Sequence, residues 1–121
     1  MSFTGLSIII PTKDRGAVFD RTLSAAYSSS EGIRSEILII NDSKTSRPNI
    51  PINFHDRVKL FHNPKHGVAS ARNFGASHAV YSHYIFLDDD ILIFPENLHK
   101  LILTLEQHPK AAINLNWIYP P

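Results

Sequence analysis

Cysteine is absent from the 121-residue sequence, so disulfides, thiolate zinc sites and a cysteine nucleophile are all excluded. A strong charge of either sign is also missing. The formal net charge is +1, which gives no electrostatic reason to expect nucleic acid as a partner. No apolar run approaches the roughly 20 residues that cross a bilayer, and the first residues lack the features of a secretory signal. We therefore expect a soluble, cytoplasmic protein without a membrane span.

What the chain does contain is typical of one globular domain. Hydrophobic residues make up 43% of it and charged residues 19%, which is not the composition of a disordered chain. A chain of this size buries roughly two thirds of its unfolded surface, enough to form a core. We expect residues 1–121 to fold as a single domain.

Short apolar runs rich in β-branched residues alternate with segments of helical period. The apolar runs predict five strands, at residues 6–10, 36–40, 58–61, 84–87 and 111–115. The helical segments predict helices at residues 18–30, at residues 68–81, and from Pro95 to just before Pro109. This alternation predicts an α/β fold in which right-handed crossovers build a mostly parallel, Rossmann-like sheet flanked by helices.

Two of these elements carry more specific predictions. The run at 84–87 has the length and composition of a buried strand. In the second helix, small and apolar residues fall on one face that we expect to pack on the sheet: Val68, Ala71, Gly75 and Ala79. Arg72 lies on the same side, and because a buried Arg needs a partner, we expect it to point along the sheet edge at an anion.

Polar side chains follow each of the first four strands. In a parallel sheet the loops after the strands emerge at one edge, where ligands bind. The residues expected there are Thr12, Lys13 and Asp14 after the first strand, Asp42 after the second, His66 and Gly67 after the third, and Asp88, Asp89 and Asp90 after the fourth. Of the seven histidines only His66 falls at this edge, and no role is assigned to it.

The three successive carboxylates suggest a cation. Crowded carboxylates disfavour their own charged forms, and Mg²⁺ typically binds one or two carboxylates together with substrate phosphates. An acidic turn before a proline-initiated helix is the plain alternative. With Arg72 to offset phosphate charge and Asp42 to accept an N–H from a base or hydroxyls from a sugar, the set fits a metal-bound nucleotide, such as an activated sugar nucleotide.

Four segments also resemble the landmarks of family 2 glycosyltransferases with the GT-A fold. They are residues 7–15 (Ser-Ile-Ile-Ile-Pro-Thr-Lys-Asp-Arg), 39–43 (Ile-Ile-Asn-Asp-Ser), 63–75, which contains Ala-Arg-Asn-Phe-Gly, and 86–90 (Phe-Leu-Asp-Asp-Asp). The resemblance runs from about Leu6 to Leu105. It implies a glycosyltransferase whose donor is a nucleoside-diphosphate sugar, and a UDP-sugar is the donor we expect. The acceptor is a saccharide or a lipid, and the resemblance does not specify which.

The resemblance also implies roles for single residues. The Asp-x-Asp motif falls on Asp88 and Asp90, with Asp90 the first metal ligand and Mn²⁺ or Mg²⁺ the cofactor. The nucleotide-sugar-binding residues it implies are Pro11, Thr12, Asp14, Asp42, Arg72, Asp88 and Asp89, among which Asp42 recognises the base. Asn41 and Lys13 depart from the family pattern, which leaves the identity of the base open.

Members of the family continue beyond this length into an acceptor-binding half that carries the general base for inverting transfer. We therefore expect a nucleotide-binding half without its C-terminal acceptor-binding half. No acidic residue follows Glu106, so no catalytic base is assigned. We expect the chain to bind a donor without transferring the sugar, and to associate with itself through the face that later strands would cover.

Four other interpretations are open. A receiver domain would need an acidic pair after the first strand and a Lys after the fifth, and neither is present. A haloacid-dehalogenase-like phosphatase needs Thr where Leu92 stands. A nucleotidyltransferase on the same fold usually has a Gly-rich loop after the first strand, which is missing here. A non-enzymatic α/β binding module, the fourth interpretation, requires no particular sequence motif.

Overall fold

A computed structural model of the chain describes residues 3–108. They form a four-stranded sheet of order β3-β2-β1-β4, in which every neighbouring pair is parallel. The strands are β1 (Leu6–Thr12), β2 (Ser35–Asn41), β3 (Val58–His62) and β4 (His83–Phe86). The helices are α1 (Ala17–Ser29), α2 (Val68–His78), α3 (Pro95–Gln107) and the short 3₁₀ helix η1 (Ile52–Phe54). The α/β prediction is confirmed, and the strand predicted at 111–115 lies outside the described residues.

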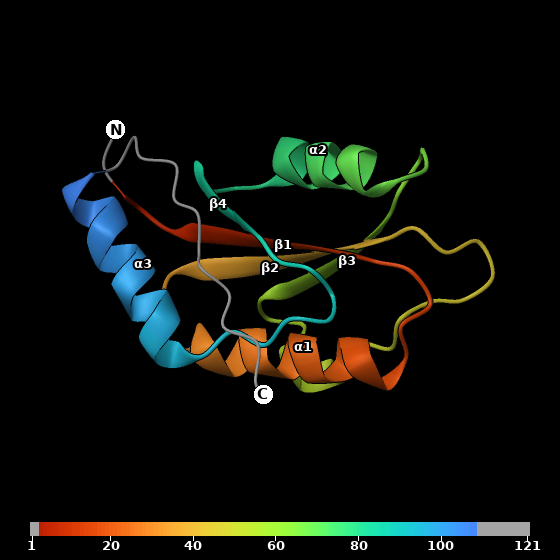
Figure 1. Cartoon of the computed structure of the whole chain (residues 1–121), viewed down its shortest axis with the longest axis horizontal. Helices are drawn as coiled ribbons and strands as arrows, with labels where there is room; N and C mark the ends of the chain where they lie inside the picture. Colours follow the sequence, from red (N-terminus) through yellow and green to blue (C-terminus); the bar gives the residue numbers. More distant parts are fainter. Residues whose placement is uncertain (1–2, 109–121) are drawn as a thin grey trace, which may run out of the picture.

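The sheet is the middle of three layers. Helix α2 covers one face, while α1 and α3 cover the other (Figure 1). Strand β2 is buried along its whole length and β1 at every position except Pro11, because these two central strands have helices on both sides. The carboxyl ends of the strands and the N-terminus of α2 all meet at one edge of the sheet, which lies at the right in Figure 1. None of the helices within residues 3–108 is long and apolar enough to cross a membrane.

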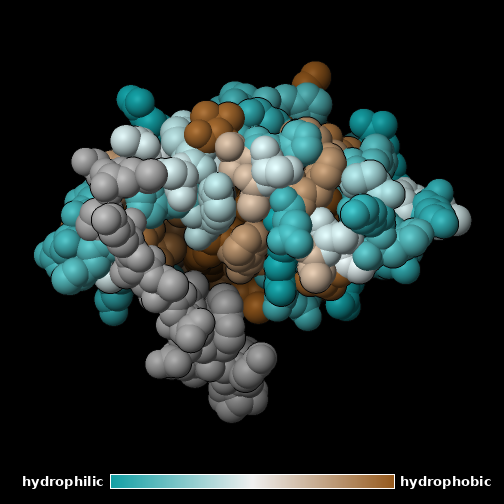
Figure 2. Space-filling view, turned by 90° about the horizontal axis from the view of Figure 1, so that it is seen from above, coloured by the Kyte–Doolittle hydropathy of each residue, from teal (hydrophilic) through white to brown (hydrophobic). Residues whose placement is uncertain are grey.

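The prediction that the fourth strand is buried is wrong for one of its faces. Tyr84 and Phe86 are each 43% exposed, whereas Ile85 and Leu87 are buried. Within the described residues β4 pairs with β1 alone, and α2 packs chiefly over β1 and β2. The face of β4 on the α2 side is therefore left open. Apolar side chains reach the surface in the middle of this side of the molecule (Figure 2).

Helix α2 is also shorter than predicted, and two residues of its expected buried face are not buried: Val68, and Ala79, which follows the helix and is half-buried. Ala71 and Gly75 pack on the sheet, and a Cβ at Gly75 would lie only 2.5 Å from Cγ2 of Ile9. Val68 is 54% exposed, because the first turn extends past the strands to the edge of the sheet. The helix ends at His78. The N–H of Ala79 still bonds the carbonyl of Ala76, but Ala79 is in an extended conformation and the N–H of Val80 donates to the Glu36 carboxylate at 2.6 Å.

The first helix ends as predicted. It stops at Ser29, the N–H of Ser30 bonds the carbonyl of Ala26, and Gly32 follows with φ of 80°. Only glycine adopts this left-handed conformation without steric cost. The tight turn it allows feeds the chain directly into β2 and so sets the start of the central strand.

Candidate functional site

A cavity of about 520 Å³ opens where the strands end. Its lining residues come from all the segments that were predicted to meet there: Pro11, Thr12, Lys13, Asp14, Arg15, Asp42, Gly67, Val68, Ala71, Asp88, Asp89 and Asp90. Of the predicted nucleotide-binding and metal-binding residues only Arg72 is not part of the wall, and His66, which was expected at the same edge, is not part of it either. The structure thus brings together residues up to 79 positions apart in sequence, from Pro11 to Asp90, as the strand-end rule requires.

The wall is strongly acidic. It contains five carboxylates, from Asp14, Asp42 and Asp88–Asp90, against two cationic side chains, Lys13 and Arg15. An anionic ligand such as a diphosphate would meet repulsion here unless a cation entered with it. The donor set, oxygen atoms from carboxylates, is the set that Mg²⁺ and Mn²⁺ prefer.

Asp89 is committed to the protein itself. Its side chain is buried, accepts a hydrogen bond from Thr12 Oγ1 at 2.9 Å, and pairs with Arg15 Nε at 3.2 Å. Both partners come from the end of β1 and the loop after it. Asp89 therefore ties the end of β4 to the end of β1 and holds the two sides of the cavity together.

Asp88 makes the second pair. Its Oδ1 lies 3.2 Å from Arg72 Nη2, and the Arg72 guanidinium lies 6.0 Å above the ring of Phe86. The Nε of Arg72 is buried and has no hydrogen-bond partner among residues 3–108. Arg72 thus stands behind Asp88 and reaches the cavity through it, so its charge is felt there without its side chain forming the wall.

Asp90 is the member of the triplet that has no partner among residues 3–108. It is exposed in the cavity wall, and no hydrogen bond or ion pair joins its side chain to another described residue. No cluster of three or more His, Asp or Glu side chains placed to hold a metal occurs in the described part of the chain. A cation bound here would therefore take only some of its ligands from the protein and the remainder from phosphate or water, which is the usual behaviour of Mg²⁺.

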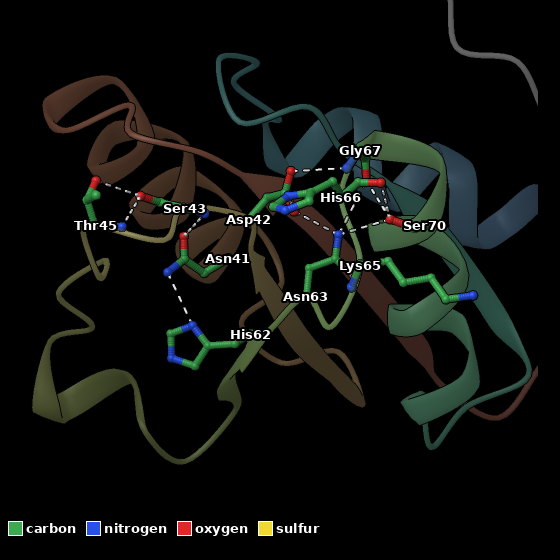
Figure 3. A network of polar contacts seen from close by, with 10 residues as sticks. All are labelled: Asn41, Asp42, Ser43, Thr45, His62, Asn63, Lys65, His66, Gly67 and Ser70. Atoms are coloured by element: carbon green, nitrogen blue, oxygen red, sulfur yellow. Dashed lines mark hydrogen bonds and ion pairs between the residues drawn. The ribbon is translucent and has the colours of Figure 1, made fainter.

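Asp42 follows β2 and lies at the centre of a polar network (Figure 3). Its Oδ1 accepts a hydrogen bond from Asn63 Nδ2 at 2.9 Å, and its Oδ2 accepts one from the N–H of Gly67 at 3.2 Å. His66 Nδ1 lies 3.8 Å from the same Oδ1. Asp42 is half-buried and borders the cavity, so its carboxylate is held by the loop before α2 while it faces the ligand space.

Asp14 also borders the cavity, but its carboxylate is used to hold a loop. It accepts hydrogen bonds from Ser43 Oγ at 2.6 Å and from Ser46 Oγ. These bonds, that from Ser43 first, hold the pKa of Asp14 below its usual value. Asp14 has φ of 54°, a left-handed conformation that Asp adopts more readily than most residues. The loop after β1 is thereby fastened to the loop after β2.

The structure adds residues that were not among the predicted nucleotide-binding or metal-binding residues. Arg15 pairs with Asp89, and Gly67, Val68 and Ala71 form the wall beside the N-terminus of α2. The N-cap of α2, Gly67, provides no side chain to bond the first backbone N–H groups of the helix. A helix start of this kind favours an anion such as phosphate. In the sequence, these residues were marked only by being close to the end of a predicted strand. That closeness does not distinguish residues that line the cavity from their neighbours that do not.

Residues 7–120 match the profile of a protein family described as Glycosyl transferase family 2. A validoxylamine A glucosyltransferase of Streptomyces hygroscopicus subsp. jinggangensis is 29% identical over 94% of this chain. An uncharacterized glycosyltransferase of Rickettsia conorii is 29% identical over 87% of it. The chain spans 28% of the length of the first relative and 18% of the second.

Solved structures show the same fold. The crystal structure of S. aureus TarS superimposes with a TM-score of 0.72 and 18% sequence identity, over 88% of this chain and 20% of that chain. A crystal structure of TarS 1-349 gives a TM-score of 0.68 over 88% of this chain and 33% of that chain. At this level of identity the similarity concerns the fold alone.

Proposed function

Because this chain belongs to glycosyl transferase family 2, we propose that its cavity binds the nucleotide part of a nucleoside-diphosphate sugar together with a divalent cation. One observation carries the proposal. Five carboxylates face two cationic side chains in the cavity wall, and the carboxylate of Asp90 has no partner among the described residues. A diphosphate enters such a site only with a cation that carries enough positive charge.

The wall residues have distinct roles in this proposal. Asp90, with Asp88, would hold Mn²⁺ or Mg²⁺, and that cation would stabilise the negative charge of the diphosphate leaving group. The N-terminus of α2 at Gly67 faces the same space and favours phosphate. Arg72 adds positive charge from behind Asp88, and Asp89 keeps the ends of β1 and β4 together.

Asp42 would accept an N–H from the base, because its carboxylate borders the cavity and an ionised carboxylate is purely an acceptor. Pro11, Thr12 and Asp14 form the wall on the β1 side of the same space. We propose uridine as the base. Glucose is the sugar to test first, because two Streptomyces relatives are named as glucosyltransferases.

We propose further that residues 1–121 act as one donor-binding domain that does not transfer the sugar by itself. The support is that the chain spans 28% or less of the length of the two relatives compared above. The base that deprotonates the acceptor would then come from outside these residues, and so would the acceptor site. Release of a glycosylated product or of free sugar by the 121-residue chain, incubated with a bound donor, would contradict this part.

Calorimetric titration tests the donor site. UDP, GDP, ADP and CDP are titrated with Mn²⁺ and again with a chelator, and we expect one diphosphate to bind with Mn²⁺ at least tenfold more tightly than without it. Asp90→Asn should remove most of that gain, because it deletes the unpartnered carboxylate. Glu96→Gln, an exposed acid in the first turn of α3, is the matched control and should leave the affinity unchanged. Equal affinities with and without the metal would overturn the metal role.

A further inference from the structure

The network around Asp42 identifies a residue that tunes the proposed base contact. Asn63 follows β3 directly and lies in the loop before α2, with its side chain pointing toward Asp42 (Figure 3). We infer that Asn63 is a positioning residue, which holds the Asp42 carboxylate in the orientation that receives the base. This inference rests on the proposed function and names a specificity determinant of the same site.

The hydrogen bonds give the carboxylate one defined orientation. Asn63 Nδ2 donates to Oδ1 of Asp42, and the N–H of Gly67 donates to Oδ2. With one protein donor on each oxygen, the carboxylate plane is fixed at two points. A carboxylate has about four lone-pair sites, so acceptor capacity remains for a ligand N–H.

The orientation of the Asn63 amide is itself fixed. Its Oδ1 accepts the N–H of Lys65 at 3.2 Å, so the NH₂ group must face the other way, toward Asp42 and Ser70. Its second donor reaches Ser70 Oγ at 3.0 Å. The backbone N–H of Asn63 also bonds the carbonyl of Asn41 at 2.8 Å, which fastens the start of the loop to the end of β2. Neither a smaller side chain nor an ionised carboxylate at position 63 would supply this donor.

Few charged groups compete for Asp42. His66 Nδ1 lies 3.8 Å from its Oδ1, and the remaining charged groups in the cavity wall are Lys13, Asp14, Arg15 and Asp88–Asp90. Neither Lys13 nor Arg15 pairs with Asp42 in the structure, since Arg15 is committed to Asp89. Asn63 is therefore the side chain that sets the hydrogen-bonding state of this carboxylate.

The first experiment compares two probes, UDP with Mn²⁺ and inorganic pyrophosphate with Mn²⁺, by calorimetry at pH 7. For Asn63→Ala we expect UDP to bind roughly tenfold more weakly, because the Asp42 carboxylate is then no longer held in place and must be oriented when the base binds. Pyrophosphate, which has no base, should bind as it does to the unchanged protein. A variant that had merely lost structure would weaken both probes together, and an unchanged UDP affinity would overturn the inference.

Asn63→Asp gives a second readout, in case the alanine variant folds poorly. It places two carboxylates in contact, and such a pair keeps one shared proton at low pH and repels when both are charged. The shared proton replaces the lost N–H, so UDP should bind well near pH 5 and roughly tenfold or more weakly near pH 8. The unchanged protein and the control Ser70→Ala, which leaves the Asn63–Asp42 bond in place, should show no such loss.

Asp42→Ala separates this inference from the proposed function. If Asp42→Ala weakens UDP but Asn63→Ala does not, the positioning role fails while the site stands. If the unchanged protein binds none of the diphosphates, or Asp42→Ala binds UDP as well as the unchanged protein, the proposed base contact fails and the positioning role fails with it.

Discussion

The side-chain amide of Asn41 holds the loop after β2 and does not face the cavity. The residue is buried, its Oδ1 accepts the N–H of Ser43 at 3.1 Å, and its Nδ2 donates to the carbonyl of Ser46 at 2.9 Å. Family resemblance places an acid at this position, yet Asn41 does not form part of the cavity wall. The amide is needed here because the carbonyl of Ser46 requires a donor.

Asn41→Asp should therefore lower the free energy of unfolding by about 1–3 kcal/mol, since a buried charge would face a carbonyl oxygen that has lost its donor. Urea denaturation measures this. The matched control is Asn49→Asp, an exposed position in the same loop region, which should change little. UDP affinity measured below the unfolding transition should be retained. A variant of unchanged stability that no longer bound the nucleotide would show that Asn41 contacts the base after all.

Residue-level prediction from sequence succeeded where a simple rule applied. Asp42 and Asp88–Asp90 follow strands directly, so the geometry of a parallel sheet brings them to one cavity. The partner of each acid could not be predicted, because the pairing of Asp89 with Arg15 depends on how two loops far apart in sequence approach one another. The Asn63–Asp42 bond depends in the same way on the path of the loop before α2.

At the scale of elements, a buried carboxylate fastens the other edge of the sheet. Glu36 in β2 is only 4% exposed, and it accepts hydrogen bonds from Ser7 Oγ in β1 at 2.7 Å, Lys59 Nζ in β3 at 3.0 Å and the N–H of Val80 after α2 at 2.6 Å. Burial on its own raises the pKa of Glu36. The three hydrogen bonds and the charge of Lys59 together outweigh burial and lower the pKa below its ordinary value of 4.5.

The sign of the pH dependence follows from this lowered pKa. The stabilisation by Glu36 is fully present above pH 4.5, the ordinary value, and is lost as the pH falls through the lower pKa of the folded state. Glu36→Gln should cost roughly 1–3 kcal/mol of unfolding free energy at pH 7, and the difference from the unchanged protein should shrink as the pH falls toward 3. Urea denaturation at several pH values measures both, with the exposed Glu31→Gln as control. If the difference in unfolding free energy between Glu36→Gln and the unchanged protein stayed constant with pH, the stabilising role of the Glu36 charge would be contradicted.

Local pattern predicted the elements better than their surroundings. All four strands within residues 3–108 and all three α-helices were found from hydrophobic period and helix-terminal signals. The burial of β4 was predicted wrongly because an apolar run does not reveal whether its strand lies inside a sheet or at its side. That position depends on which strands pair, and a single strand's sequence does not specify its neighbours. The burial of Val68 was also predicted wrongly, because the helical period does not show where the sheet beneath the helix ends.

At the scale of the whole molecule, β4 is one of the two edge strands that the described residues form, and β3 is the other. In the described part of the chain the backbone of β4 pairs on the β1 side alone, and three apolar side chains at and just before this strand are open to solvent. They are Val80, Tyr84 and Phe86, with 68%, 43% and 43% of their surface exposed. An edge with unpaired backbone groups and apolar neighbours favours pairing with another strand.

We therefore predict that the 121-residue chain associates with itself through β4, in a way that depends on concentration. Sedimentation velocity from about 1 to 100 µM should show a rising average mass, a range in which weak protein contacts form. Tyr84→Lys should shift the association to higher concentration, because a charged side chain at an exposed edge opposes strand pairing. Ile52→Lys is the matched control: Ile52 is 85% exposed in η1, away from β4, and its replacement should leave association unchanged. A protein that stays monomeric throughout, or one in which both lysine variants dissociate equally, would place the contact elsewhere or remove it.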